Sequence, residues 1–161
     1  MIRKIIFIML IMLMASGCGS EAKDSSTPIK SSEVQTNMNT NADMKQINKI
    51  KMQIENHTFD IILEDNPAAA MLIKKLPLQI EMQELNGNEK YYKFNETFPT
   101  ADNNPGKIHV GDVMLFNGSY LVIFYKEFTT GYSYTRLGRI ENIDNFTELV
   151  GDKNINVLIT N

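Results

Sequence analysis

Few side chains in this sequence could act as nucleophiles or hold a metal ion. The 161 residues include one Cys and two His, which is too few for a multi-cysteine or three-histidine metal centre. His57 and His109 have no Ser, Cys or carboxylate partner at a spacing typical of catalysis. Asp60, Glu64 and Asp65 do not follow the calcium-loop pattern, and no glycine-rich phosphate loop or Gly-x-Ser-x-Gly elbow is present. We therefore predict no catalytic residue, no metal and no cofactor.

The single cysteine lies where an export signal would end. Arg3 and Lys4 precede an apolar run over residues 5–14, and small residues occupy positions 15–17, which is typical of a signal peptide. The run is about half of the roughly 20 residues that a membrane-spanning helix needs. The sequence Ala-Ser-Gly-Cys, ending at Cys18, resembles the bacterial lipobox. This implies that Cys18 carries acyl chains such as palmitate and begins the mature protein. The alternative is an ordinary secretory signal followed by an incidental cysteine.

Composition and charge divide the rest of the chain into two parts. The whole chain is 43% hydrophobic and 22% charged with a net charge of −3, which is typical of a globular protein and argues against nucleic-acid binding. Removing residues 1–17 leaves 14 basic and 19 acidic residues, a net charge of −5, so we expect the lipid and not charge to bind the membrane.

Residues 18–48 are polar and aperiodic, which predicts a flexible tether, with a folded segment as the alternative. Residues 49–161 form the predicted domain, outside the cytoplasm on the bacterial cell membrane or outer membrane.

Residues 49–161 are dominated by strand-like alternation of apolar and polar residues. Asn66-Pro67 is typical of a helix start, Pro77 follows its end, and Asp144 is predicted to cap a second, short helix. Asn117-Gly118 predicts a tight turn, and the apolar run at 120–125 predicts a strand buried on both faces or crossing a barrel wall. The predicted strands are 50–54, 58–63, 78–83, 89–94, 113–116, 120–125, 132–140 and 155–159, with an irregular loop over 95–107. About eight strands with two helices predict a mainly β fold, either a closed barrel or a sandwich.

Several motifs of this region occur together in one known family. They are Leu63-Glu64-Asp65-Asn66-Pro67-Ala68-Ala69, Leu76-Pro77-Leu78, Leu85-Asn86-Gly87-Asn88-Glu89-Lys90-Tyr91, Pro105-Gly106, Val110-Gly111-Asp112, Phe124-Tyr125 and Tyr132-Ser133-Tyr134-Thr135-Arg136-Leu137-Gly138-Arg139-Ile140. With these motifs, residues 49–161 resemble the bacterial cyclophilin-like domain family. The resemblance implies a closed cyclophilin-like β-barrel capped by a helix.

The resemblance does not extend to the active site of true cyclophilins, which are peptidyl-prolyl isomerases. The sequence has no Phe-His-Arg motif, no Gln-Gly-Gly-Asp-Phe motif and no Trp. Isomerisation needs no nucleophile, since one fixed cation over the twisted amide would lower the barrier of ~18–20 kcal/mol. Arg136 and Arg139 are the candidates, and their odd separation predicts opposite faces, with Arg136 beside Tyr132 and Tyr134. The alternative is a solvent-facing Arg136 stacked on these tyrosines.

A candidate ligand pocket borders the predicted loop. Tyr91 and Phe94 offer rigid apolar area, and Asn88 and Glu89 offer polar groups. The full predicted pocket consists of Arg136, Tyr132, Tyr134, Tyr91, Phe94, Asn88 and Glu89. Core packing of the rings and a surface ion pair in the turn are the alternative explanations. We predict a lipid-anchored module that binds a small molecule or a peptide. The alternatives are a divergent isomerase or folding helper, and an accessory module that presents the barrel to a protein partner.

Overall fold

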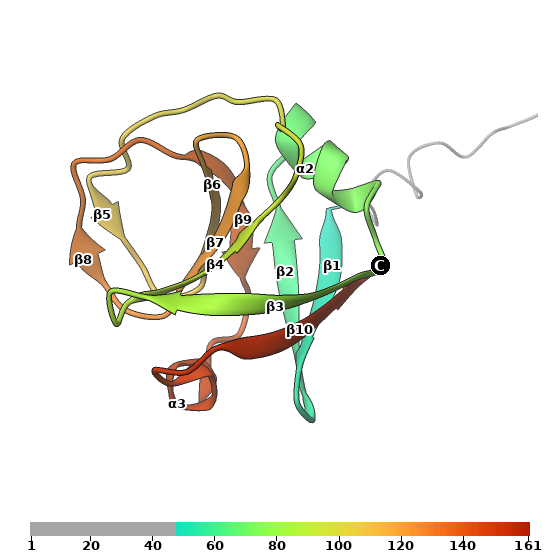
Figure 1. The fold of residues 1–161 in the computed structure, drawn as a ribbon, viewed down its shortest axis with the longest axis vertical. Coiled ribbons are helices and arrows are strands. Elements are labelled where there is room, and N and C mark those ends of the chain that lie inside the picture. The colour runs from blue at the N-terminus through green and yellow to red at the C-terminus, as the bar shows by residue number, and fades with distance from the viewer. Residues whose placement is uncertain (1–47) are drawn as a thin grey trace, which may run out of the picture. The chain divides into compact units, whose positions relative to one another are not determined.

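Short antiparallel strands make up most of the described chain (Figure 1). The structure is a computed structural model that describes residues 48–161, so Cys18, the predicted signal and nearly all of the predicted tether lie outside it. The elements are β1 (Lys49–Ile54), β2 (His57–Leu63), α2 (Pro67–Ile73), β3 (Leu78–Leu85), β4 (Glu89–Lys93), β5 (Lys107–Ile108), β6 (Asp112–Phe116), β7 (Tyr120–Phe124), β8 (Phe128–Thr129), β9 (Thr135–Ile140), α3 (Phe146–Val150) and β10 (Ile155–Thr160).

Eight of these strands close into one antiparallel barrel, in the order β1-β10-β3-β4-β7-β6-β9-β2. Strand β10 completes the circle by pairing with both β1 and β3. Closure leaves none of the eight with an open edge. The prediction of a mainly β barrel of about eight strands with two helices is confirmed, and the sandwich is excluded. The strand predicted at 132–140 begins only at Thr135.

Alternate residues of the strands point into the barrel and form its core. In β1, Ile50, Met52 and Ile54 are buried, whereas Lys51 and Gln53 are exposed. The alternation seen in the sequence therefore reports directly which face of β1 lies inside.

The helices lie at opposite ends of the barrel (Figure 1). Helix α2 begins as predicted: Asn66 Oδ1 accepts a hydrogen bond at 2.9 Å from the N–H three residues on, and Pro67 occupies the first turn. The prediction that Asp144 caps the second helix is wrong, because Asn145, in left-handed backbone conformation, occupies the N-cap of α3 without a side-chain cap bond. Phe146 of α3 is fully buried in the core. Neither helix of the described part is long and apolar enough to cross a membrane.

A second layer covers the outer face of β6 and β7. Strands β5 and β8 pair with each other, and Figure 1 shows them standing outside the barrel. Five buried side chains form a hydrophobic cluster outside the barrel wall: Ile108, Met114, Val122, Phe124 and Tyr134. Strand β7 is therefore buried on both faces, as its apolar run predicts.

A bulge shifts the register between β6 and β9. Arg136 lies opposite Met114, whereas Arg139 lies opposite Asp112, and the register changes between these pairs. Directly opposite residues share a face of the sheet, and Met114 belongs to the outer cluster. Both arginines thus lie on the outer face. Their predicted placement on opposite faces is wrong, because the bulge adds one residue to β9.

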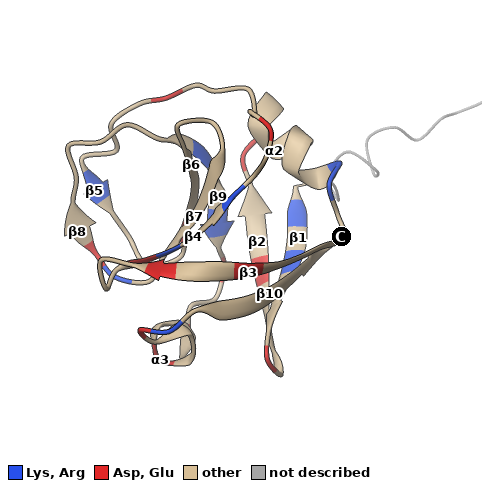
Figure 2. Cartoon of the chain, in the orientation of Figure 1, with Lys and Arg blue, Asp and Glu red and all other residues tan. Residues whose placement is uncertain are grey.

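Charged residues of both signs are spread along the barrel, with basic segments on β1 and β5 (Figure 2). Lys49 Nζ lies 2.8 Å from Asp60 Oδ2 on β2 and 2.9 Å from Glu141 Oε2 after β9. The hydrogen bonds to Asp60 and Glu141 raise the pKa of Lys49. These contacts join β1 to β2 and to the segment that follows β9.

Candidate functional site

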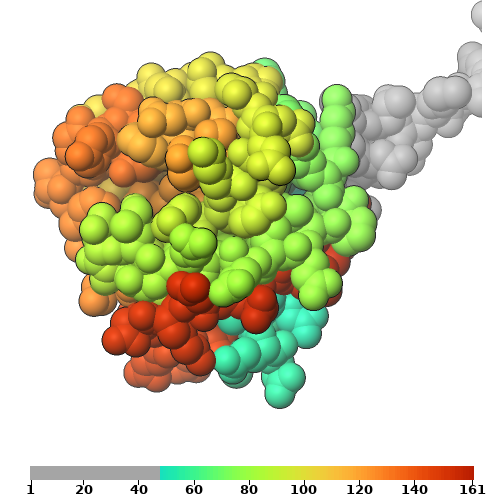
Figure 3. Space-filling model, in the orientation of Figure 1, coloured from blue at the N-terminus to red at the C-terminus, as the bar shows by residue number. Residues whose placement is uncertain are grey.

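The outer wall of the barrel carries a pocket bounded by aromatic rings. Its volume is about 410 Å³. Its walls come from the end of β3, the following turn, strands β4, β6 and β7, and the segment before β9. They consist of Leu85, Asn86, Glu89, Tyr91, Phe116, Asn117, Tyr120, Val122, Tyr132 and Tyr134. In Figure 3 the green end of the β3–β4 hairpin and the orange segment around β8 lie beside each other at the left of the view. Half of the lining residues are Tyr or Phe, so the pocket offers mainly ring surfaces to a ligand.

The barrel register places three of these rings side by side. Tyr91 on β4 lies opposite Val122 on β7, and Phe116 on β6 lies opposite Tyr120 on β7. Val122 belongs to the outer cluster, so Tyr91 also faces outward. The ring centroid of Tyr120 is 6.1 Å from that of Tyr91 and 6.4 Å from that of Phe116. The three rings therefore form a continuous aromatic wall.

Two tyrosines from the segment before β9 form the facing wall. The ring of Phe116 lies 5.5 Å from Tyr134 and 5.8 Å from Tyr132, measured between centroids. Tyr134 is buried, and its backbone exchanges two hydrogen bonds with Asn103, at 2.9 and 3.0 Å. Tyr132 is 66% exposed. Tyr134 is therefore held in place, whereas Tyr132 lies at the rim of the pocket.

Glu89 supplies the carboxylate of the pocket. It lies opposite Leu85 on β3 and Phe124 on β7, which are both apolar. Burial, followed by repulsion from Glu84, raises the pKa of Glu89 to about 7. Within residues 48–161 no ion pair includes Glu89, and none of the pocket-lining residues is Lys or Arg. The negative charge of this pocket is therefore unbalanced.

Three predicted pocket residues, Phe94, Asn88 and Arg136, lie outside the pocket. Phe94 belongs to the barrel core, where its ring centroid is 4.7 Å from that of Phe98. Phe94 lies two residues after Tyr92, so its side chain points to the same inner face of the sheet, whereas Tyr91 points to the outer face. Asn88 precedes Glu89 but does not line the pocket. Its backbone carbonyl accepts a hydrogen bond from Tyr125 at 3.0 Å, and its buried Oδ1 has no hydrogen-bond partner among the described residues.

Lys90 does not form the surface ion pair that the turn sequence suggested. It is fully buried inside the barrel, and its Nζ donates hydrogen bonds of 2.8 Å to the backbone carbonyls of Gly151 and Lys153. The same ammonium group lies 4.5 Å from the ring centroid of Tyr125. Burial lowers the pKa of Lys90. Its role in the structure is to fix the segment that follows α3.

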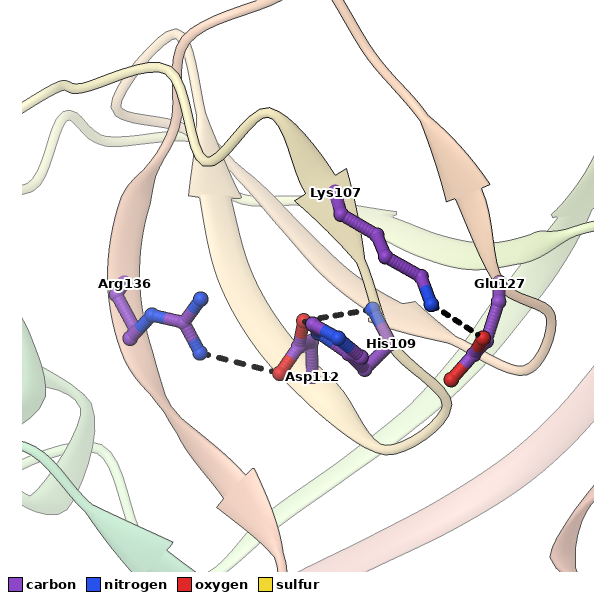
Figure 4. Close-up of polar contacts among 5 residues, drawn as sticks. All are labelled: Lys107, His109, Asp112, Glu127 and Arg136. Atoms are coloured by element: carbon purple, nitrogen blue, oxygen red, sulfur yellow. Dashed lines mark hydrogen bonds and ion pairs between the residues drawn. The ribbon is translucent and has the colours of Figure 1, made fainter.

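Arg136 is held by a buried carboxylate outside the pocket (Figure 4). Its Nη1 lies 3.1 Å from Asp112 Oδ1. Asp112 is 1% exposed, and its Oδ2 accepts a hydrogen bond from the backbone N–H of His109 at 2.9 Å. The Nδ1 of His109 lies 3.7 Å from the same oxygen, so His109 has a carboxylate neighbour that the sequence did not suggest. Arg136 is therefore paired with Asp112, a partner that neither sequence hypothesis included.

A second ion pair lies beside this group. Lys107 Nζ on β5 is 2.9 Å from Glu127 Oε2 (Figure 4), and this hydrogen bond lowers the pKa of Glu127. Among residues 48–161 no group of three or more His, Cys, Asp or Glu side chains could hold a metal ion. The polar groups in this region thus act as contacts between neighbouring segments.

Sequence reasoning missed Phe116, Tyr120 and Asp112. Phe116 and Tyr120 flank the predicted Asn117-Gly118 turn, and residues flanking a tight turn pair across it on one face of the sheet. Tyr120 has the same parity as Val122 within the apolar run. Asp112 is a single acidic residue beside the apolar stretch 113–116, where a buried charge requires a partner. These patterns could have identified all three residues.

The chain was compared with protein families, curated proteins and solved structures. A sequence profile described as the Cyclophilin-like family matches residues 52–160. None of the curated proteins matches the chain. Among solved structures, the chain is similar to the solution structure of a hypothetical protein from Archaeoglobus fulgidus. The two are 14% identical with a TM-score of 0.48, and the match covers 70% of this chain and 92% of that one.

Proposed function

This chain belongs to the cyclophilin-like family, and from that premise we propose that it is a binding module whose outer pocket takes a small molecule or a peptide. The proposal includes a lipid anchor at Cys18, which holds the barrel on the outer side of a bacterial membrane. The anchor is supported by the export signal and the lipobox-like sequence described above.

The observation that carries the proposal is the aromatic pocket. Its volume of about 410 Å³ lies within the range of small-molecule sites, which are typically 300–1,000 Å³ and apolar with few polar groups. Five rings and one carboxylate meet this description. The rings come from strands of the barrel and from a segment anchored by Asn103, so most of the site is rigid before a ligand arrives.

The pocket supports binding more strongly than isomerisation. An isomerase would need a fixed cation over the proline amide, and the candidate for it was Arg136. The Arg136 guanidinium is paired with Asp112 at 3.1 Å, and Arg136 does not line the pocket. An isomerase assay on a proline tetrapeptide distinguishes the two functions. We expect no turnover above the uncatalysed rate, and turnover that Arg136→Ala abolishes would contradict the proposal.

Binding is tested by titrating two neutral probes, p-cresol and an acetylated Ala-Ala-Pro-Ala amide, into the full chain in nonionic detergent. We expect saturable changes in the amide NMR signals of β4, β6 and β7 from at least one probe. Tyr132→Ala should weaken that binding by roughly fivefold or more, which is within the range for losing an aromatic contact.

Ile62→Ala is the matched control, because Ile62 is also an exposed apolar residue but lies outside the pocket. It should leave the affinity unchanged. The absence of saturable signals from both probes up to their solubility limits would contradict binding of neutral apolar groups in this pocket.

A further inference from the structure

The pocket combines a carboxylate that has no ion-pair partner within residues 48–161 with several aromatic rings, of which Tyr132 is exposed and Tyr91, Phe116 and Tyr120 are partly exposed. Glu89 lies between apolar neighbours, has no ion-pair partner within residues 48–161, and shares its pocket with no Lys or Arg. A half-buried carboxylate in such surroundings is costly when ionised. A positive group entering the pocket would offset that cost, whereas a negative ligand would be repelled.

The rings favour the same sign of charge. The faces of Tyr and Phe rings attract cations electrostatically, and the attraction is stronger where water is excluded. Phe116 packs against Tyr120, Tyr132 and Tyr134 with centroid distances between 5.5 and 6.4 Å. A cation placed among these rings would meet several of them at once.

The structure already contains one such contact at the edge of the pocket. Lys93 Nζ lies 5.4 Å from the ring centroid of Tyr120. Lys93 belongs to a neighbouring hollow, which shares Tyr91 and Tyr120 with the pocket. The rings that separate the two hollows thus attract an ammonium group on one side, and the pocket side is open to another.

We infer that the ligand of this pocket carries a compact organic cation, a substituted ammonium group, seated among the tyrosine and phenylalanine rings against the carboxylate of Glu89. The inference rests on the proposed function, because it specifies the chemistry of the ligand that the pocket binds. It concerns a small molecule, since the carboxylate and rings converge on a volume of about 410 Å³.

The test compares choline with 3,3-dimethylbutan-1-ol, its neutral isostere, in which carbon replaces the charged nitrogen. Each is titrated into the full chain in nonionic detergent and phosphate buffer at pH 8. Binding is followed by tyrosine fluorescence, because the chain has no Trp and six Tyr, of which Tyr91, Tyr120, Tyr132 and Tyr134 line the pocket. We expect choline to bind at least about tenfold more tightly than the neutral isostere.

Two pocket variants and one matched control test whether this preference arises in the pocket. Glu89→Gln should reduce the preference for choline severalfold while leaving the affinity for the neutral isostere nearly unchanged. Glu81→Gln is the matched control, because it removes an equal charge from an exposed residue of the neighbouring hollow, and it should retain the preference. Tyr132→Leu keeps apolar area but removes a ring, and it should weaken choline more than the isostere.

Each alternative result is decisive. Equal affinities of choline and its isostere would overturn the inference and leave the proposed binding function intact. Binding of p-cresol or the peptide without any binding of choline would do the same. An equal loss of preference in Glu81→Gln and Glu89→Gln would also overturn it, because the general field of the protein would then explain the selectivity. Failure of all four probes would remove the proposed function as well.

Discussion

At the scale of single residues, the pocket changes the protonation of one acidic side chain, Glu89. Glu89 has an ordinary pKa of 4.5, which burial and repulsion from Glu84 raise to about 7. At pH values between 4.5 and about 7, Glu89 is therefore mostly protonated in the folded protein and mostly ionised in the unfolded chain. Because the folded state then binds more protons, the contribution of Glu89 to stability falls as the pH rises from 4.5 to 7. Above pH 7 the loss is complete and constant.

We therefore expect Glu89→Gln to raise the free energy of unfolding at pH 8 by about 1–2 kcal/mol, a value discounted for solvent screening of a partly exposed group. At pH 4 the variant and the parent should be nearly equal, since Glu89 is mostly protonated in both states. Urea unfolding followed by tyrosine fluorescence at the two pH values measures the difference. Equal stabilities at pH 8 would show that the ionised carboxylate costs the fold nothing.

At the scale of elements, one close approach between strands depends on a glycine. Gly138 on β9 pairs with Leu63 on β2, next to the bulge that turns both Arg136 and Arg139 outward. A Cβ atom at Gly138 would lie 2.3 Å from the backbone carbonyl oxygen of Ile62 and 3.0 Å from the Cα of Leu63. Backbone atoms cannot rotate away as a flexible side chain can, so β2 and β9 would have to separate.

Gly138→Ala should accordingly destabilise the protein by about 1–3 kcal/mol, the usual cost of overpacking. The change would appear as a lower midpoint of urea unfolding. Gly131→Ala is the matched control, because a Cβ there meets nothing within 4 Å, and such a surface change should alter stability by less than about 0.5 kcal/mol. A wild-type midpoint for Gly138→Ala would contradict the close packing of β2 against β9.

The elements also show which features a sequence can predict. The Asn66 cap, the alternation in β1 and the apolar run of β7 depend on residues within a few positions of one another, and these predictions are confirmed. The bulge in β9, the two-residue strands β5 and β8 and the pairing of Arg136 with Asp112 depend on contacts between distant segments. Sequence reasoning correctly placed Tyr91, Tyr132, Tyr134 and Glu89 in one group. It could not separate them from Phe94, because the pairing of distant strands in the barrel decides that the Phe94 side chain points inward.

At the scale of the whole molecule, the anchor is the main prediction. Acyl chains contribute about 0.8 kcal/mol per buried methylene, and two or three chains together hold a protein firmly in a membrane. We expect Cys18→Ala to move the protein from the membrane fraction to the soluble fraction, as measured by fractionation and immunoblotting. Ser20→Ala, two residues away, should leave it in the membrane fraction. Retention of Cys18→Ala in the membrane would contradict lipidation at Cys18 as the anchor.

The circular strand order fixes where the pocket lies relative to the start of the described chain. Counted around the barrel, β7 is four positions from β1 on either side, so the strand at the centre of the pocket lies diametrically across from the strand at which the described chain begins. The described chain therefore begins on the wall of the barrel farthest from the pocket, so the start of β1 contributes nothing to the pocket lining.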